Sequence, residues 1–297
     1  MKKFISANLR VLVLAVAMVA SGLGLGVVHA ANGGITISPT SINHEIAPGA
    51  SYKTEILVVN QGEIDQNYKI YATPYSVTGD EYKPYFEPVK GALDITKWFS
   101  FERTGGPIKV GNQDTIPFTI SVPKGTGAGS YYATVFAETS DAAKSGVVTR
   151  KRVGTVVYIR VSGNAVERGS VDSWQVPWLQ QDPLHATLKM ANTGSVHYEA
   201  GIKIKVDDVF GGTKFNYERK PKVLPQKLRS IPVVWEDGAK FGLFKVSGEV
   251  KYFDKTAKLP TRYVFIANTP MRIITAGMLI AFVAAVIFVG KKRVARK

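Results

Sequence analysis

Apolar and polar residues alternate along most of the chain, and this period of two constrains the fold more than any other feature. Ile116, Phe118, Ile120 and Val122 are separated by Pro, Thr and Ser, and a Pro-Lys-Gly turn follows at 123–125. Side chains on a strand point alternately to opposite faces, so the pattern is typical of a strand with one face in a core. Similar runs occur at 55–59, 68–72, 130–137, 156–161, 184–190, 201–206, 246–252 and 263–267. The sequence therefore predicts an all-β fold of sandwiches.

A weak internal repeat divides the middle of the chain into two units. Asn60-Gln61-Gly62 and Asn192-Thr193-Gly194 each follow an alternating strand, where the glycine is available for a positive φ. The interval from Asn60 to Ile116 is 17 residues longer than the interval from Asn192 to Ile231, which indicates an insertion in the first unit. We expect two tandem Ig-like β-sandwiches at 31–163 and 164–268, with the insertion at about 74–97.

The N-terminal end has the pattern of a secretory signal. Lys2, Lys3 and Arg10 precede an apolar run at 11–28, and Val-His-Ala ends at residue 30. This arrangement predicts a signal peptide at 1–30. An uncleaved N-terminal anchor is the alternative, because the apolar run is long enough for one.

The C-terminal end has the pattern of a membrane anchor. Residues 273–290 carry no charge, and Lys-Lys-Arg-Val-Ala-Arg-Lys follows. The sequence therefore predicts a transmembrane helix at 269–290 and a basic cytoplasmic tail at 291–297, with the N-terminus outside. The lipid bilayer is then one partner, and the expected localisation is the cell membrane in a single pass.

Composition excludes several classes of function. The absence of cysteine excludes disulfides, thiolate metal sites and a cysteine nucleophile. Much of the net charge of +15 lies at the two ends, so a nucleic-acid partner is not expected. His44-Glu45 lacks the second histidine of a zinc-protease helix, since position 48 is proline. We expect no catalytic residues, no metal and no cofactor, and therefore no enzyme.

Aromatic residues in the insertion are the leading candidates for ligand contact. Residues 74–88 contain four aromatics and three prolines, a stiff apolar surface suited to sugar rings or an extended peptide. The alternative is that these rings cover their own sandwich. In the second unit two tryptophans flank Pro177, whereas Trp235 ends an alternating strand and is expected in the core. The ligand-contact candidates are Tyr75, Tyr82, Tyr85, Phe86, Trp174 and Trp178.

Several short motifs resemble a known family. They are Ile-Thr-Ile-Ser-Pro at 35–39, Trp-Phe-Ser-Phe at 98–101, Ile-Ser-Val-Pro at 120–123, Gly-Ser-Tyr-Tyr-Ala at 129–133 and Asn-Thr-Gly-Ser-Val-His at 192–197. With the layout of the two ends, the chain resembles the WxL-interacting proteins, membrane-anchored surface proteins of Gram-positive bacteria. The resemblance implies a first domain that binds peptidoglycan and a second that binds other surface or host proteins. No ligand-contacting residue of that family matches a position here.

The sequence therefore predicts a non-enzymatic, membrane-anchored bacterial cell-surface protein. Its Ig-like domains are expected to bind cell-wall polymer (peptidoglycan) or another surface protein. The alternative is a structural stalk or accessory subunit of a membrane complex, without a ligand of its own.

Overall fold

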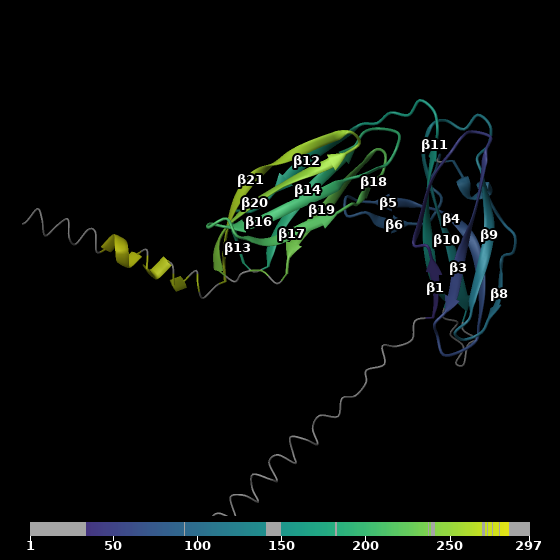
Figure 1. Cartoon of the computed structure of the whole chain (residues 1–297), viewed down its shortest axis with the longest axis horizontal. Helices are drawn as coiled ribbons and strands as arrows, with labels where there is room; N and C mark the ends of the chain where they lie inside the picture. Colours follow the sequence, from purple (N-terminus) through teal and green to yellow (C-terminus); the bar gives the residue numbers. More distant parts are fainter. Residues whose placement is uncertain are drawn as a thin grey trace, which may run out of the picture.

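Two β-sandwiches follow one another along the chain (Figure 1). The computed structural model describes residues 34–91, 93–140, 150–181, 183–236, 238 and 241–268, and helical residues between 271 and 284 except 272, 275 and 279. The all-β prediction is confirmed. The predicted signal peptide at 1–30 and basic tail at 291–297 lie outside the described residues.

The first unit, here the N-terminal sandwich, packs a four-stranded sheet on a five-stranded one. Ile116, Phe118 and Ile120 point inward and are almost completely buried, as their alternation predicts. In sheet order, the strands are β1 (Ile35–Ser38), β3 (Ser51–Asn60), β9 (Gln113–Ser121) and β7 (Phe99–Phe101), then β2 (Ser41–Ile46), β11 (Arg150–Val161), β10 (Gly129–Ser140), β4 (Gln66–Pro74) and β8 (Gly105–Ile108). A short 3-10 helix, η1 (Ile95–Trp98), adds Ile95 and Trp98 to this core.

The second unit, here the C-terminal sandwich, has its own core between a three-stranded and a five-stranded sheet. Leu184, Leu188 and Met190 alternate along one strand and are fully buried. In sheet order, the strands are β12 (Gly169–Gln175), β14 (Leu184–Asn192) and β19 (Lys227–Trp235), then β13 (Leu179–Gln180), β21 (Lys255–Ala267), β20 (Phe241–Tyr252), β16 (Gly201–Asp208) and β17 (Thr213–Arg219), with a small pair of β15 (Tyr198–Glu199) and β18 (Lys222–Val223).

The repeated asparagine has the same role in both sandwiches. Asn60 is fully buried, and its amide donates to the carbonyls of Ile64 and Ile108 while its oxygen accepts from the N–H of Gly62. Asn192 is buried as well, and it makes the same three bonds to the carbonyls of Val196 and Val223 and to the N–H of Gly194. One side chain thus ties a strand end to two later segments, which explains why the motif recurs.

The glycine of the second motif is needed for close approach. Gly62 and Gly194 lack the positive φ that the sequence suggested. A Cβ on Gly194 would lie 2.2 Å from the carbonyl oxygen of Val166. Any other residue would therefore push apart the loop between β11 and β12 and the end of β14.

The apolar C-terminal segment is helical where it is described, between 271 and 284. Within the described residues, no helix has both the length and the apolar character needed to cross a membrane. This finding corrects the transmembrane helix expected at 269–290, the lipid bilayer as a partner and the cell-membrane localisation. Residues 285–290 of that segment lie outside the described part of the chain.

Candidate functional site

The insertion forms a hairpin that joins the two sandwiches. Its strands are β5 (Ser76–Thr78) and β6 (Lys83–Tyr85), which pair antiparallel. In Figure 1 the hairpin extends from the N-terminal sandwich to the C-terminal one. We call residues 76–85 the brace hairpin, because its turn makes the contacts described next.

Tyr82 anchors the brace hairpin in the C-terminal sandwich. Tyr82 is 8% exposed, and its ring packs with Val77 and Leu224. Its hydroxyl accepts a hydrogen bond of 3.0 Å from the backbone N–H of Leu224. The guanidinium of Arg229 lies 4.4 Å from the ring centre, within the range of a cation–π contact. Tyr82 has a φ of 58°, a left-handed conformation that a tyrosine rarely adopts, so tertiary contacts hold it there.

Asp80 supplies the polar contacts of the same turn. Its carbonyl accepts from the N–H of Ser230 at 2.7 Å, on the free side of edge strand β19. Its carboxylate pairs with the Lys189 ammonium at 2.9 Å. The hydrogen bond from Lys189 lowers the pKa of Asp80, so the carboxylate is charged at neutral pH.

The six ligand-contact candidates do not form one surface, although Tyr75 packs against the cluster that contains Tyr82. Tyr75 and Phe86 are half-buried with ring centres 6.0 Å apart, and Phe86 also packs on Phe136 of β10. Tyr82 is buried between the sandwiches, whereas Tyr85 is 38% exposed.

The two candidate tryptophans of the C-terminal sandwich also differ in burial. Trp174 is buried in the core, and its indole N–H donates to the carbonyl of Pro260 at 3.1 Å. Trp178 is 71% exposed. The structure therefore brings Tyr75 and Phe86 together and separates both from the tryptophans.

A second contact between the sandwiches is a serine–histidine pair that the sequence did not reveal. Ser130 is the second residue of β10, and its Oγ lies 2.8 Å from Nδ1 of His197 while accepting from the His197 backbone N–H at 3.0 Å. The imidazole also packs against Tyr132 and Tyr158, with ring centres 5.7 and 5.4 Å away. These residues come from opposite sandwiches, 67 positions apart, so no local motif marks them.

This pair is a poor catalytic dyad. Burial, with smaller effects from Lys222 and Arg160, lowers the pKa of His197 to about 4. An imidazole with so low a pKa is too weak a base to activate the serine hydroxyl efficiently at neutral pH. Ser130 also uses a lone pair to accept from the His197 backbone. The geometry is that of a structural hydrogen bond between the sandwiches. Among the described residues, no group of three His, Cys, Asp or Glu side chains is placed to hold a metal.

An apolar pocket of about 270 Å³ opens beside the insertion. Its walls come from the end of β4 and the two residues that follow it, from residues 87–89 and 93–95, and from the start of β10. They comprise Pro74, Tyr75, Ser76, Glu87, Pro88, Val89, Leu93, Asp94, Ile95, Ser130, Tyr131 and Tyr132. Val89 and Leu93 are 48% and 59% exposed, so two apolar side chains stand in solvent. The sequence pattern gave these two residues no role, since a local pattern does not show which apolar residues remain exposed.

Charge at the rim of this pocket is negative. Asp94 caps η1, where its carboxylate accepts from the N–H and the hydroxyl of Thr96. These bonds lower the pKa of Asp94. Glu87 lines the same pocket and is exposed. An apolar cavity flanked by carboxylates favours an apolar group that carries a positive charge nearby.

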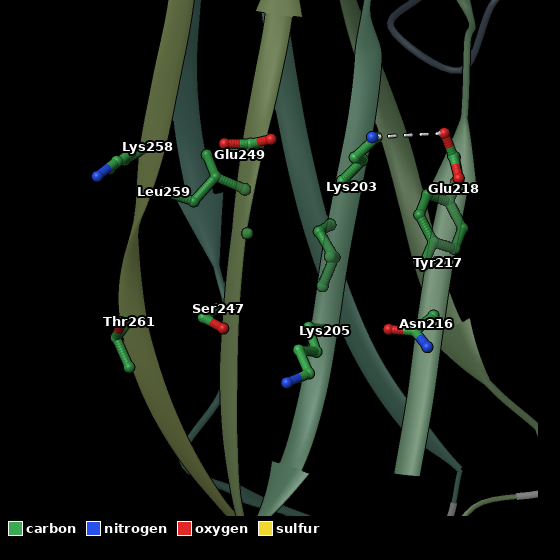
Figure 2. Close-up of a pocket in the computed structure, with 12 residues that line it drawn as sticks. Lys203, Lys205, Asn216, Tyr217, Glu218, Ser247, Glu249, Lys258, Leu259 and Thr261 are labelled. Atoms are coloured by element: carbon green, nitrogen blue, oxygen red, sulfur yellow. Dashed lines mark ion pairs between the residues drawn. The ribbon is translucent and has the colours of Figure 1, made fainter. Parts of the chain in front are cut away.

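A larger hollow of about 640 Å³ lies on the outer face of the five-stranded sheet of the C-terminal sandwich (Figure 2). It forms where Gly248 and Ser247 of β20 leave space between longer side chains. Lysines and glutamates alternate across it, and Lys203 pairs with Glu218 at 4.0 Å. Because both signs are interspersed and solvated, this face has no strong preference for an anion.

Comparisons with known proteins identify no family. No family model matches the chain, and no curated protein matches it. Among solved structures, the class 5 fimbriae chaperone CfaA is 11% identical, with 79% of this chain and 99% of that chain covered and a TM-score of 0.40. The CsuC–CsuE chaperone–tip subunit complex from Csu pili of Acinetobacter baumannii gives 12% identity, 79% and 99% coverage and a TM-score of 0.39. The E. coli chaperone DraB gives 10% identity, 79% and 98% coverage and a TM-score of 0.38.

The assignment to the WxL-interacting proteins is corrected by these findings. No family model and no curated protein supports it. The physical reason lies in the motifs: Ile120 and Val122, for example, are buried core residues, which specify a sandwich and not a ligand. The function that the resemblance implied is corrected with it. This includes the membrane-anchored surface protein, its partners peptidoglycan and another surface protein, and the alternative of a stalk in a membrane complex.

Proposed function

We propose that this chain is a non-enzymatic binding protein whose insertion pocket receives an apolar side chain from a partner protein. The observation that supports the proposal is the pocket itself, about 270 Å³ in volume and walled by tyrosine, proline and aliphatic side chains. A cavity of this size fits a single large side chain better than a cofactor. Val89 and Leu93 at its rim would be removed from water on binding.

The acidic rim defines the chemistry of the partner segment. Glu87 and Asp94 flank the apolar walls, so the preferred segment has lysine or arginine close to the inserted apolar residue. Tyr75 contributes its ring to the wall, which gives one of the sequence candidates a contact role. Ser130 and Tyr132 also line the pocket while contacting His197, so a bound segment lies close to the boundary between the sandwiches.

Selection of peptides from a displayed random library with the full chain tests this proposal. Selected sequences are expected to combine a large apolar residue with a neighbouring basic one. Leu93→Asp is expected to abolish binding of the selected peptides, because it places a charge at the apolar rim. Ile64→Asp is the matched control, since Ile64 is equally exposed at 59% but lies away from the pocket lining. Peptides that bind both variants equally would overturn the proposal.

A further inference from the structure

A basic hollow lies where the turn of the brace hairpin meets the C-terminal sandwich. Its volume is about 490 Å³, and its walls come from that turn, from the end of β17 and the two residues after it, and from the middle of β19. Arg219, Lys220 and Arg229 bring three positive charges to these walls. Among the described residues that line the hollow, Glu81 is the one carboxylate. We call this feature the basic hollow.

Arg229 is a half-buried cation without a carboxylate partner. One of its N–H groups donates to the carbonyl of Lys222, and its guanidinium lies 4.4 Å from the ring centre of Tyr82. No ion pair joins it to a carboxylate in the part of the chain that the structure describes. A guanidinium has five N–H donors, and a charge that is partly removed from water is unfavourable without a counter-ion. Arg229 therefore has donors left for an anion that the chain itself does not supply.

The acidic residues of the hairpin turn do not neutralise the basic hollow. Glu81 pairs with Lys83 at 3.3 Å, and both side chains are exposed. Asp80 pairs with Lys189 at 2.9 Å. Because each carboxylate has a lysine of its own, the positive charges on the walls stay uncompensated.

The hydroxyl of Tyr217 shows that the two arginines face the same space. It donates to the carbonyl of Pro232 at 3.2 Å, which places it between β17 and β19. Burial raises the pKa of Tyr217, whereas the charges of Arg219 and Arg229 both act to lower it. A Coulomb effect of this kind falls with distance, so the guanidinium groups of the two strands converge at one wall.

This set of donors favours an anion with several oxygens. Each guanidinium presents a planar fork that binds two oxygens, and Lys220 adds a compact charge. A single carboxylate occupies one fork. A phosphoryl group offers three terminal oxygens and about two negative charges, so it can engage all three cations at once.

We propose that the basic hollow binds a phosphoryl group, as a free ion or as part of an ester, through Arg219, Lys220 and Arg229. The site shares no lining residue with the insertion pocket, so it stands independently of the function proposed above. Because Arg229 stacks on Tyr82 of the brace hairpin, the bound group lies beside the contact between the two sandwiches.

Calorimetric titration of the full chain with pyrophosphate tests the proposal. The wild type is expected to bind pyrophosphate saturably, with the ionic strength held constant because salt screens exposed charges. The double variant R219Q/K220Q should lose affinity about tenfold or more, since it removes two of the three cations. Both side chains are exposed and have no ion pair within the described residues, so thermal unfolding of this variant should match that of the wild type.

A matched double variant separates this site from general attraction to a basic protein. R262Q/K258Q also removes one arginine and one lysine, at exposed positions of β21 that lie outside the lining of the basic hollow. Its affinity for pyrophosphate should stay within about twofold of wild type, because charges far from the site are screened. Equal loss in the two double variants, or no saturable binding by the wild type, would overturn the proposal.

Arg229→Lys tests whether the fork itself takes part. The variant keeps the positive charge but replaces two parallel donors by a single ammonium, so the affinity for pyrophosphate should fall about fivefold or more. Thermal unfolding without pyrophosphate is measured in parallel, since the contact with Tyr82 changes as well. A lower unfolding temperature with an unchanged affinity would show that Arg229 only stabilises the fold, and would overturn the proposal.

Glycerol 3-phosphate distinguishes the two sources of the phosphoryl group. Saturable binding of this ester that R219Q/K220Q weakens and R262Q/K258Q does not would support the proposal with an organic phosphate as the ligand. Binding of pyrophosphate alone, with the same response to the two variants, would support it with a free ion as the ligand.

Discussion

Replacing Tyr82 with phenylalanine removes one hydroxyl from the boundary between the two sandwiches. That hydroxyl accepts a 3.0 Å hydrogen bond from the buried N–H of Leu224. In the phenylalanine variant the N–H has no partner, which costs about 1–3 kcal/mol of the free energy of unfolding. Tyr82→Ala also removes the buried ring and its contact with Arg229, so we expect a loss of about 3–5 kcal/mol.

Hydrogen exchange of individual amides locates this loss of stability better than thermal unfolding of the whole chain does. A chain with two cores need not unfold in one step, so a single transition temperature mixes local and global events. The backbone amide of Leu224 is expected to exchange faster in Tyr82→Phe than in wild type. The amides of Asn192 and Ile116, inside the two cores, should remain nearly unchanged.

Tyr85 provides the matched control from the same hairpin. It is 38% exposed, and Tyr85→Phe should change the free energy of unfolding by less than about 0.5 kcal/mol. If Tyr82→Phe left both the stability and the exchange of Leu224 unchanged, the brace hairpin would not fix the boundary between the sandwiches as described.

Two further outcomes follow from the same contacts. The pKa of His197 is about 4 in the folded chain against 6.5 ordinarily, so the unfolded chain binds the proton first as the pH falls. The free energy of unfolding should be highest above pH 6.5 and should fall by up to about 3 kcal/mol toward pH 4. Denaturant titrations at a series of pH values should show this loss in the wild type but not in His197→Gln. Asn60→Ala and Asn192→Ala should each lower the free energy of unfolding in denaturant by about 3 kcal/mol or more, because each leaves three backbone groups without their partner. Asn43→Ala is the control: this position is exposed, so the loss should be less than about 0.5 kcal/mol.

The prediction of the fold depended on the alternation of apolar and polar residues along the chain. Each run of alternating apolar residues became a strand, and Trp235, expected in the core, is 9% exposed and stacks on Phe215. The recurring asparagine was also visible in the sequence. Its hydrogen bonds were not, because Ile108 and Val223 lie far along the chain from the asparagines that they contact.

The contacts between the two sandwiches could not be predicted from the sequence, for a physical reason. Asp80 and Ser230 are 150 positions apart, and their pairing depends on the relative placement of two finished sandwiches. Tyr82 has a positive φ without the glycine or asparagine that would have marked it. The exposed aromatic surface considered for 74–88 is instead divided among a hairpin contact, a pocket wall and one exposed ring, Tyr85. Ligand contact at the six candidates stays a prediction, and among them Tyr85 and Trp178 are exposed.

The affinity of the full chain for a selected peptide, measured by calorimetry for wild type, Leu93→Asp and Ile64→Asp, tests the central claim most directly. The account predicts that wild type and Ile64→Asp bind equally well, whereas Leu93→Asp loses binding while its thermal unfolding stays that of wild type. Equal affinity for all three chains, or equal loss in both variants, would contradict the assignment of the insertion pocket as the partner-binding site.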